Sequence, residues 1–267
     1  MPKQVANDAV QYHIGLSKNM VEEAEYVLLP GDPYRVESLA KVFDPNAKHL
    51  ANSREYTSYL ANFYGQKVLV CSTGMGCPST AIGVEELAMI GLKYFIRIGT
   101  CGGIQEYTNL GDVIISHAAV RLEGTSSHYA PMEYPAVASL ELTNALVAGA
   151  KDTNTPFHVG ITASSDTFWP GQERLDNYSG YLLRRFKGSM AEWRALNVLN
   201  FEMEAATLFV LCSVFGLQGA CICGVVAKRT ESEIPSLDTK AGSAKRNWEN
   251  VAREGILNHM KQRGLIY

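Results

Sequence analysis

The stretch KYFIRIGTCGGI, residues 93–104, places an arginine inside an apolar run that ends in a glycine-rich turn. Apolar runs of this kind are typical of buried strands in α/β proteins. A charge in such a strand needs a partner, because an unpaired buried charge is very unfavourable. Two partners for Arg97 stay open. One is a structural carboxylate, and the other is an anionic ligand at the carboxyl end of the strand, where α/β sheets bind ligands.

Segments on both sides of this stretch alternate between strand-like runs and helical patterns. We expect strands over residues 24–31, 66–73, 93–100, 110–120, 155–165 and 220–227. We expect helices over residues 32–43, 74–92 (after a Gly-rich turn), 139–151, 204–216 and 247–264. This order predicts an α/β sheet covered by helices on both faces. Because no repeat or linker interrupts it, we interpret residues 1–267 as a single domain.

The composition is that of an ordinary globular protein, with 46% hydrophobic residues and a formal net charge of −3. No run of Lys and Arg stands out, which argues against nucleic acid as a partner. Residues 205–227 carry no charge, but Gly216, Gln218 and Gly219 interrupt them, so we expect a buried helix and strand rather than a membrane span. The N-terminus is too polar for a signal peptide. We therefore expect a cytoplasmic protein whose partners are small molecules and copies of itself.

The six cysteines and six histidines form no familiar metal or disulfide motif. The cysteines include no CxxC pair, and the histidines include no HExxH motif, so a catalytic zinc site is disfavoured. We expect reduced, buried thiols.

Two glycine-rich turns connect a strand to a helix, at Gly31-Asp32-Pro33 and over residues 72–79. Backbone N–H groups at such a junction can bind an anion, although a tight turn needs glycine in any case. Neither turn has the GxGxxG spacing of dinucleotide-binding proteins or the Gly-Lys-Ser/Thr of a phosphate-binding Walker loop.

Two further segments carry groups that could bind a sugar or a planar ring. Glu202 and Glu204 stand at the start of an apolar helix, where they could cap the helix or accept hydrogen bonds from sugar hydroxyls. A glycosidase pair is disfavoured, because its two carboxylates must lie on opposite sides of the sugar. SSDTFWPGQERLD, residues 164–176, is either a surface loop or a site that stacks on a planar ring and binds its polar edge.

Together these segments resemble the nucleoside phosphorylase family, in particular its bacterial uridine-cleaving members. The resemblance runs from about residue 10 to 260 and is carried by LPGDPYRV, SREYTSY, VCSTGMGCPST, FIRIGTCGGI, SSDTFWPGQER, NFEMEAATL and KRTESEIP. It implies a three-layer αβα fold around a mixed, partly barrel-like central sheet. It also implies reversible phosphorolysis of uridine to uracil and ribose 1-phosphate, as in pyrimidine salvage. Inorganic phosphate is then the co-substrate, and no cofactor is required.

The resemblance also assigns roles to individual residues. Phosphate would be bound by Gly31, Arg35, Arg54, Arg97 and Thr100. Ribose would be bound by His13, Met203 and Glu204, and uracil by Phe168, Gln172 and Arg174. The catalytic residues would be Arg97, Gln172, Arg174 and Glu204. Arg54 and His13 would come from a neighbouring subunit, and the segment from Arg229 through Pro235 to Lys240 would close over the base as a flap.

Shared sites require at least a dimer, and the resemblance favours a homohexamer of three dimers. It also suggests a monovalent cation, such as K+, at Glu55, Ser79 and the Met75 carbonyl. Two positions depart from the pattern: Lys228 stands where Asn is usual, and Cys101 replaces a Thr.

Gln172 favours a pyrimidine over a purine, because an amide can donate to one ring oxygen and accept from an N–H at once. The purine-cleaving relatives use an acidic group near the position of Lys228, which this chain lacks. The alternatives are a purine nucleoside phosphorylase, a nucleoside hydrolase and a non-catalytic nucleoside-binding protein. A hydrolase is disfavoured because it would leave the arginines of the phosphate set without an anion.

Overall fold

The computed structural model describes residues 5–235 and 247–266. One mixed sheet runs through it in the order β10-β6-β8-β9-β5-β1-β4-β3-β2. The strands are β1 (Tyr26–Leu29), β2 (Lys48–Ser53), β3 (Tyr56–Phe63), β4 (Gln66–Cys71), β5 (Tyr94–Gly103), β6 (Val113–Leu122), β7 (Ala136–Val137), β8 (Phe157–Ser165), β9 (Val198–Glu202) and β10 (Gln218–Lys228). Because β10 also pairs with β5, the strands β5, β10, β6, β8 and β9 close into a barrel, while β7 pairs with β6.

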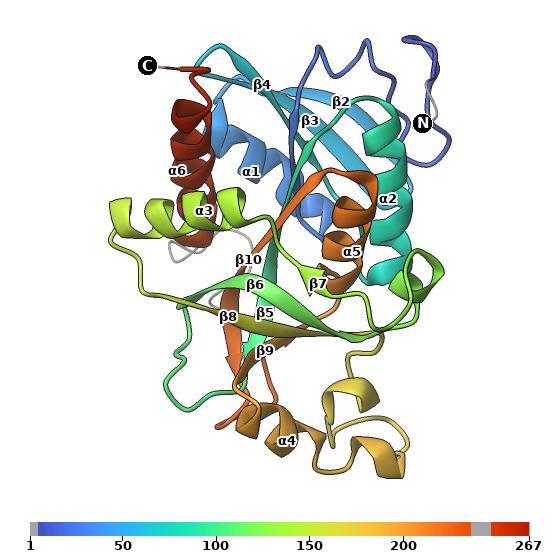
Figure 1. The fold of residues 1–267 in the computed structure, drawn as a ribbon, viewed down its shortest axis with the longest axis vertical. Helices are drawn as coiled ribbons and strands as arrows, with labels where there is room; N and C mark the ends of the chain where they lie inside the picture. Colours follow the sequence, from blue (N-terminus) through green and yellow to red (C-terminus); the bar gives the residue numbers. More distant parts are fainter. Residues whose placement is uncertain (1–4, 236–246, 267) are drawn as a thin grey trace.

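Helices cover both sides of this sheet (Figure 1). They are α1 (Val36–Phe43), α2 (Cys77–Met89), α3 (Leu140–Asp152), α4 (Ser189–Ala195), α5 (Ala205–Phe215) and α6 (Asn247–Gln262). The apolar faces of α1, α3 and α6 belong to one buried cluster, and those of α2 and α5 belong to another. The expected three-layer αβα fold with a partly barrel-like sheet is therefore confirmed.

The long uncharged stretch behaves as its sequence predicts. Residues 205–212 of α5 are all buried, the helix ends at Gly216 with a positive φ of 70°, and β10 follows directly. Glycine suits this left-handed position because it has no Cβ. Among the described residues, no helix has both the length and the apolar character needed to span a bilayer. All six cysteines are buried free thiols, as expected.

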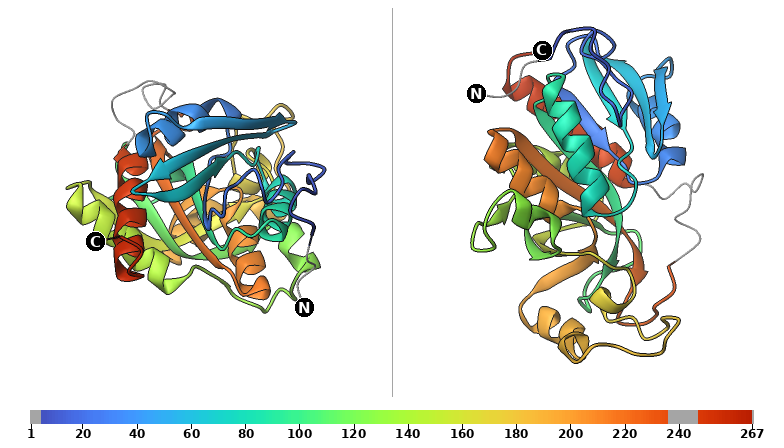
Figure 2. Two further views of the ribbon diagram at one scale, coloured as in Figure 1. Left: turned by 90° about the horizontal axis from the view of Figure 1, so that it is seen from above. Right: turned by 90° about the vertical axis from the view of Figure 1, so that its right-hand side faces the viewer.

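Some elements differ from the sequence prediction. Asp32 caps the short 3-10 turn Pro33–Arg35 rather than α1, with its side chain accepting from the Tyr34 N–H. Glu202 ends strand β9 instead of starting a helix, and Glu204 is the residue before α5. Strands β2, β3, β7 and β9 and helix α4 were not expected. Figures 1 and 2 show α4 and the neighbouring gold segment at the end of the molecule away from α1 and α2.

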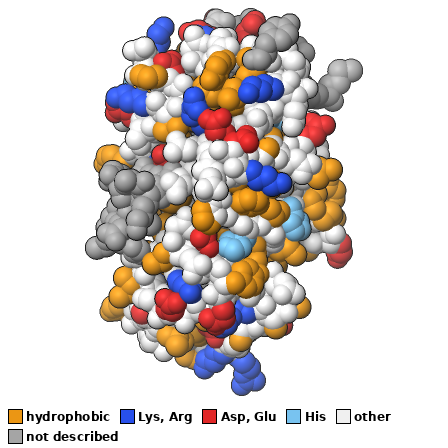
Figure 3. Space-filling model, turned by 90° about the vertical axis from the view of Figure 1, so that its left-hand side faces the viewer, with side chains coloured by type: hydrophobic (Ala, Val, Ile, Leu, Met, Phe, Trp, Pro, Cys, Tyr) orange, Lys and Arg blue, Asp and Glu red, His pale blue; other side chains and the backbone are white. Residues whose placement is uncertain are grey.

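Charged side chains of both signs are interspersed on the face shown in Figure 3, and hydrophobic side chains lie between them. On this face the mixture agrees with the small net charge of the chain. Such a surface lacks the single-sign potential that attracts nucleic acid.

Candidate active site

One cavity opens where β5 and β9 end beside the loop that follows β8. Its lining residues are Met75, Arg97, Thr100, Cys101, Gly102, Phe168, Gln172, Arg174, Phe201, Glu202, Met203, Glu204, Val226, Ala227 and Pro235. The structure thus brings together nine of the predicted site residues from five distant segments. These are Met75, Arg97, Thr100, Phe168, Gln172, Arg174, Met203, Glu204 and Pro235.

Arg97 faces two carboxylates of the same chain. Its Nε donates to Glu202 Oε2 at 2.9 Å, and its Nη2 forms an ion pair with Glu204 Oε2. Of the two partners left open for Arg97, the structural carboxylate is therefore confirmed. Binding of phosphate to Arg97 as a further partner stays a prediction. A guanidinium has five N–H donors, so these two contacts leave donors for another anion. Burial lowers the pKa of Arg97, but the Glu204 and Glu202 carboxylates more than offset this and raise it.

Glu202 has a structural task that the sequence left open. Its Oε2 accepts from the Glu204 and Ala205 N–H groups at 2.8 and 2.9 Å, which satisfies donors at the start of α5. Burial raises the pKa of the Glu202 carboxyl to about 7, against the lowering effect of Arg97 and with repulsion from Glu204. Glu202 therefore caps α5 and orients Arg97 at the same time.

Glu204 faces the cavity, although it is 3% exposed. Its Oε1 accepts from the Gly76 N–H at 2.5 Å, so the Gly-rich turn before α2 helps to hold this carboxylate. The adjacent Met203 is held as well, because the Cys77 thiol lies 3.1 Å from the Met203 carbonyl oxygen. The turn over residues 72–79 thus holds two of the three residues predicted to bind ribose, Met203 and Glu204.

Two other phosphate candidates, Arg35 and Gly31, lie near the strand that carries Arg97. Arg35 Nη1 lies 3.5 Å from the carbonyl oxygen of Ile98, the residue after Arg97. Gly31 packs against the second Gly-rich turn, since a Cβ added there would lie 3.1 Å from the Gly74 carbonyl oxygen. Arg35 and Gly31 do not appear among the cavity-lining residues, so their phosphate contacts stay predictions.

Phe168, Gln172 and Arg174, the residues predicted to bind uracil, also line the cavity, and we call them its base end. The Arg174 guanidinium carbon lies 3.9 Å from the centre of the Phe168 ring, a cation–π contact. Burial, followed by repulsion from Arg229, lowers the pKa of Arg174 to about 10, while Glu233 opposes the shift. Gln172, 3% exposed, lies in the adjoining 3-10 turn Pro170–Gln172.

Glu233 bridges the two arginines of the base end. Arg174 Nη1 donates to the Glu233 carbonyl oxygen at 2.5 Å and to its Oε2 at 3.2 Å. Arg229 Nε lies 2.6 Å from the same Oε2, and its Nη2 donates to the Gln172 carbonyl oxygen at 3.0 Å. The start of the predicted flap is therefore tied to the base end, whereas residues 236–240 of that flap lie outside the described residues.

The two departures from the family pattern have different surroundings. Cys101 lines the cavity, and burial together with hydrogen bonding to Cys223 raises its thiol pKa well above the usual range. A neutral thiol adds no negative charge beside Arg97. Lys228 Nζ pairs with Glu231 Oε1 at 2.8 Å, so its charge has a partner outside the cavity.

His13 and Arg54 lie apart from the cavity of their own chain. His13 Nδ1 lies 2.6 Å from Glu86 Oε1, and Arg54 Nη2 donates to the Tyr12 hydroxyl at 3.4 Å. Arg54 has a positive φ of 54°. Their predicted reach into a neighbouring subunit stays a prediction.

The three predicted cation ligands gather around one turn. Ser79 Oγ donates to the Met75 carbonyl oxygen at 3.1 Å, and a Cβ added at Gly74 would lie 2.9 Å from Glu55 Cγ. Hydroxyl, carbonyl and carboxylate oxygens are ligands that suit hard cations, so the residues fit a monovalent ion in kind.

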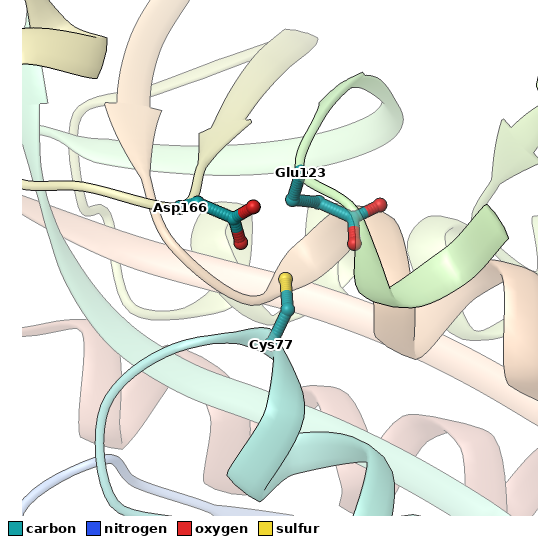
Figure 4. A group of neighbouring side chains, drawn as sticks. All are labelled: Cys77, Glu123 and Asp166. Carbon is teal, nitrogen blue, oxygen red and sulfur yellow. The ribbon is translucent and has the colours of Figure 1, made fainter. Parts of the chain in front are cut away.

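A second polar group, made of Cys77, Glu123 and Asp166, lies near this cavity (Figure 4). These side chains point toward one another, but protein donors already occupy them. Glu123 Oε2 accepts from the Ser126 N–H at 2.8 Å and the Thr207 hydroxyl at 2.9 Å, and Asp166 accepts from the Gly124 N–H. Burial raises the pKa of the Cys77 thiol well above its usual range. We assign this group to loop packing rather than to metal binding.

Sequence reasoning did not commit to several residues of the site. Glu202, Phe201, Cys101 and Gly102 line the cavity, and Glu233 touches its arginines. The signal for Glu202 was present, since it lies two residues from Glu204 in NFEMEAAT. Glu233 lies in KRTESEIP, where nothing in the sequence distinguishes it from the other acid of this segment, Glu231.

Comparisons with known proteins agree with this geometry. A sequence model of the Phosphorylase superfamily matches residues 25–255. The uridine phosphorylase of Salmonella typhimurium (strain LT2) is 54% identical over 228 residues, covering 85% of this chain and 90% of that protein. The uridine phosphorylase of Escherichia coli (strain K12) is 53% identical with the same coverage. The guanosine phosphorylase of Halorubrum lacusprofundi is 36% identical over 237 residues, covering 88% of this chain and 92% of that protein.

The chain belongs to the phosphorylase superfamily. The resemblance seen in its sequence motifs is thereby confirmed.

Proposed function

We propose that the protein is a uridine phosphorylase, a pentosyltransferase that cleaves uridine with phosphate to give uracil and ribose 1-phosphate. The observation that carries this proposal is the composition of one cavity. It is lined by Arg97 and Thr100 of the predicted phosphate set, by Met203 and Glu204 of the predicted ribose set, and by the base-end residues. The base-end residues are Phe168, Gln172 and Arg174. The identity to two uridine phosphorylases over 85% of the chain supports the same substrate.

In the proposed reaction, phosphate binds beside Arg97 and Thr100, under the anomeric carbon of the ribose. The bond between C1′ and N1 of uracil breaks with its electron pair moving to the base. The ribose then carries oxocarbenium character, which the phosphate dianion stabilises before one of its oxygens bonds to C1′. Glu204, fixed by the Gly76 N–H, accepts hydrogen bonds from the ribose hydroxyls and keeps C1′ above the phosphate.

The leaving uracil carries negative charge, which Gln172 and Arg174 stabilise at its polar edge. Phe168 packs on the ring, and Arg174 lies over the same aromatic face. Because the charge spreads into the ring, no strong general acid is required, and N1 of the uracil anion then takes up a proton from solvent. Glu233 keeps the two like-charged arginines Arg174 and Arg229 together at this end.

Closure of the flap from Arg229 would exclude water and favour phosphate over hydrolysis. Arg35 and Gly31 would complete the phosphate site from their own chain, and Arg54 would reach it from a neighbour. His13 of the neighbour would bind the ribose. We therefore also propose a cytoplasmic homo-oligomer with shared sites, most simply a hexamer of three dimers. A monovalent cation would be held by Glu55, Ser79 and the Met75 carbonyl and would brace the turn that carries Gly76.

A purine substrate is the second candidate, because a guanosine phosphorylase is 36% identical to the chain. The base end argues against it. An amide and a guanidinium suit the oxygens and N–H of a pyrimidine edge, and Lys228 stands where purine cleavage would call for an acid.

A spectrophotometric assay with uridine and inosine, each with and without phosphate, tests the proposal. We expect uracil release from uridine to require phosphate and to exceed inosine cleavage. Faster inosine cleavage would favour the purine alternative, and uracil release without phosphate would indicate a hydrolase. Tight uridine binding without turnover would indicate a binding protein.

A further inference from the structure

The guanidinium of Arg35 contacts a carboxylate from the far end of the chain. Arg35 Nη2 donates to Glu249 Oε1 at 3.2 Å across 214 positions of sequence. Both residues are buried, with 8% of Arg35 and 6% of Glu249 exposed. The pair joins the 3-10 turn before α1 to the first turn of α6.

The fold fixes Glu249 through its neighbour Trp248. Trp248 is fully buried over Gly224 of β10, where an added Cβ would lie 2.1 Å from the indole ring. Gly224 is in turn the register partner of Thr100 on β5. The first turn of α6 is therefore seated on the strand pair that carries the proposed phosphate site, and this places Glu249 at Arg35.

An acidic residue in the first turn of a helix is favoured by the helix dipole, but that effect operates equally well from solvent. Glu249 is instead buried, and a buried carboxylate is unfavourable unless a cation and hydrogen bonds compensate it. Arg35 is also held at Nη1, which lies 3.5 Å from the Ile98 carbonyl oxygen. The two contacts define the plane of the guanidinium beside the strand of Arg97.

We propose that Glu249 is a positioning residue for phosphate binding. Its carboxylate holds the Arg35 guanidinium in the orientation that binds the anion, so that α6 contributes to phosphate affinity without touching the substrate. This inference rests on the proposed function, which assigns phosphate to Arg35. It adds a residue from α6 that lies outside the sequence motifs named above.

Glu249 could act on phosphate binding by orienting Arg35 or by its own negative charge, and these two effects predict opposite changes in phosphate affinity when Glu249 is replaced. The Glu249 carboxylate repels phosphate, so removing its charge alone would tighten phosphate binding. If its main effect is to orient Arg35, losing the acceptor oxygen weakens binding instead. Glu249→Ala removes charge and acceptor, Glu249→Gln keeps an acceptor oxygen without the charge, and Glu249→Asp keeps the charge on a shorter side chain.

The test measures the phosphate Kd by calorimetry and the KM values for phosphate and uridine. We expect Glu249→Ala to raise the phosphate Kd and KM about tenfold, the loss typical of a hydrogen bond to a charged group. The KM for uridine should stay within about twofold, since the base end is separate. Glu249→Gln should recover most of the phosphate affinity, and Glu249→Asp should bind more weakly than Glu249→Gln.

Glu254→Gln is the matched control, because Glu254 pairs with Arg253 on the same helix. It should leave the phosphate Kd unchanged. Tighter phosphate binding in both Glu249→Ala and Glu249→Gln would overturn the proposal in favour of charge repulsion. A lowered Tm with unchanged phosphate Kd would overturn it in favour of a helix-stabilising role. If Glu249→Ala does not fold, the phosphate Kd values of Glu249→Asp and Glu249→Gln decide between these explanations. Weaker binding in Glu249→Asp than in Glu249→Gln supports the positioning role, and the reverse order overturns it.

The calorimetric Kd does not depend on turnover, which separates this inference from the proposed function. Wild-type protein that binds phosphate without cleaving uridine would refute the proposed function and leave the Glu249 test intact. Wild-type protein that binds no phosphate would overturn both.

Discussion

Arg97 Nε lies 2.9 Å from Glu202 Oε2, inside a barrel strand and at the floor of the cavity. The contact links the strand that carries the proposed phosphate site to the carboxylate that caps α5. Arg97 is thus oriented by the protein before any anion binds. Preorganised charge of this kind stabilises a developing charge without reorganisation during the reaction.

Glu202 should make stability depend on pH. Burial raises the pKa of its carboxyl to about 7 in the folded protein, above the ordinary value of 4.5. The folded state therefore holds an extra proton between these values, and this stabilising contribution is lost as pH rises through about 7. Relative to Glu202→Gln, wild-type protein should lose roughly 3 kcal/mol of unfolding free energy between pH 4 and pH 8. Urea unfolding at several pH values measures this difference.

The opposite slope would refute this prediction. A wild-type advantage that grows with pH would mean that Arg97 and the two N–H donors lower the pKa of Glu202 by more than burial raises it.

Glu233 should matter through the arginines that it bridges. Replacing it in Glu233→Gln removes the negative charge between Arg174 and Arg229, whose like charges then repel. We expect the KM for uridine to rise about tenfold, while the KM for phosphate changes little. Steady-state kinetics measures both values. Glu106→Gln is the control, since Glu106 pairs with Arg194 at the surface and should leave both KM values unchanged.

Gln172 should act on the leaving base. In Gln172→Ala one donor to the departing uracil is lost, and kcat for uridine should fall about a hundredfold. Gln66→Ala, at the first residue of β4, is the control and should leave kcat for uridine unchanged. Equal rates for wild type and Gln172→Ala would exclude the proposed role of Gln172.

Gly224 leaves the space that Trp248 fills. Gly224→Ala brings its Cβ within 2.1 Å of the indole ring, so we expect a loss of about 2 kcal/mol in unfolding free energy. The smaller ring of Trp248→Phe should relieve this overlap, so the double variant should lose less than the sum of the two single losses. Urea unfolding measures the three free energies. If the two single losses add up in the double variant, residues other than Trp248 move to relieve the overlap, and the prediction is wrong.

The parts of the fold that the sequence predicted have clear local signals. Strands β1, β4 and β5 are apolar runs bounded by Gly or Pro, and α5 is an uncharged helix that stops at a glycine. Strand β2 was not expected because none of its residues is fully buried, which leaves no apolar period to detect. Strand β9 is short and contains the buried Asn200, which interrupts its apolar run, and its last residue, Glu202, was expected to start a helix.

The site was predicted by motif resemblance, whereas its internal pairings were not. Arg97 and Glu202 lie 105 positions apart in the sequence, and Arg35 and Glu249 lie 214 apart. Local patterns carry no information about such distant partners, because the closed barrel and the seating of α6 decide them. Sequence could state that Arg97 needs an anion, but the fold determines which carboxylates meet it.

The affinity of Arg97 for phosphate tests the central claim most directly. Arg97→Lys keeps a positive charge for the buried Glu202 and Glu204 but loses the planar, multiply donating group. The measurement is the KM for phosphate at saturating uridine, beside Arg194→Lys, a surface ion-pair control. We predict at least about a tenfold rise for Arg97→Lys and no change for the control. An unchanged KM for phosphate in Arg97→Lys would contradict the assignment of phosphate to Arg97.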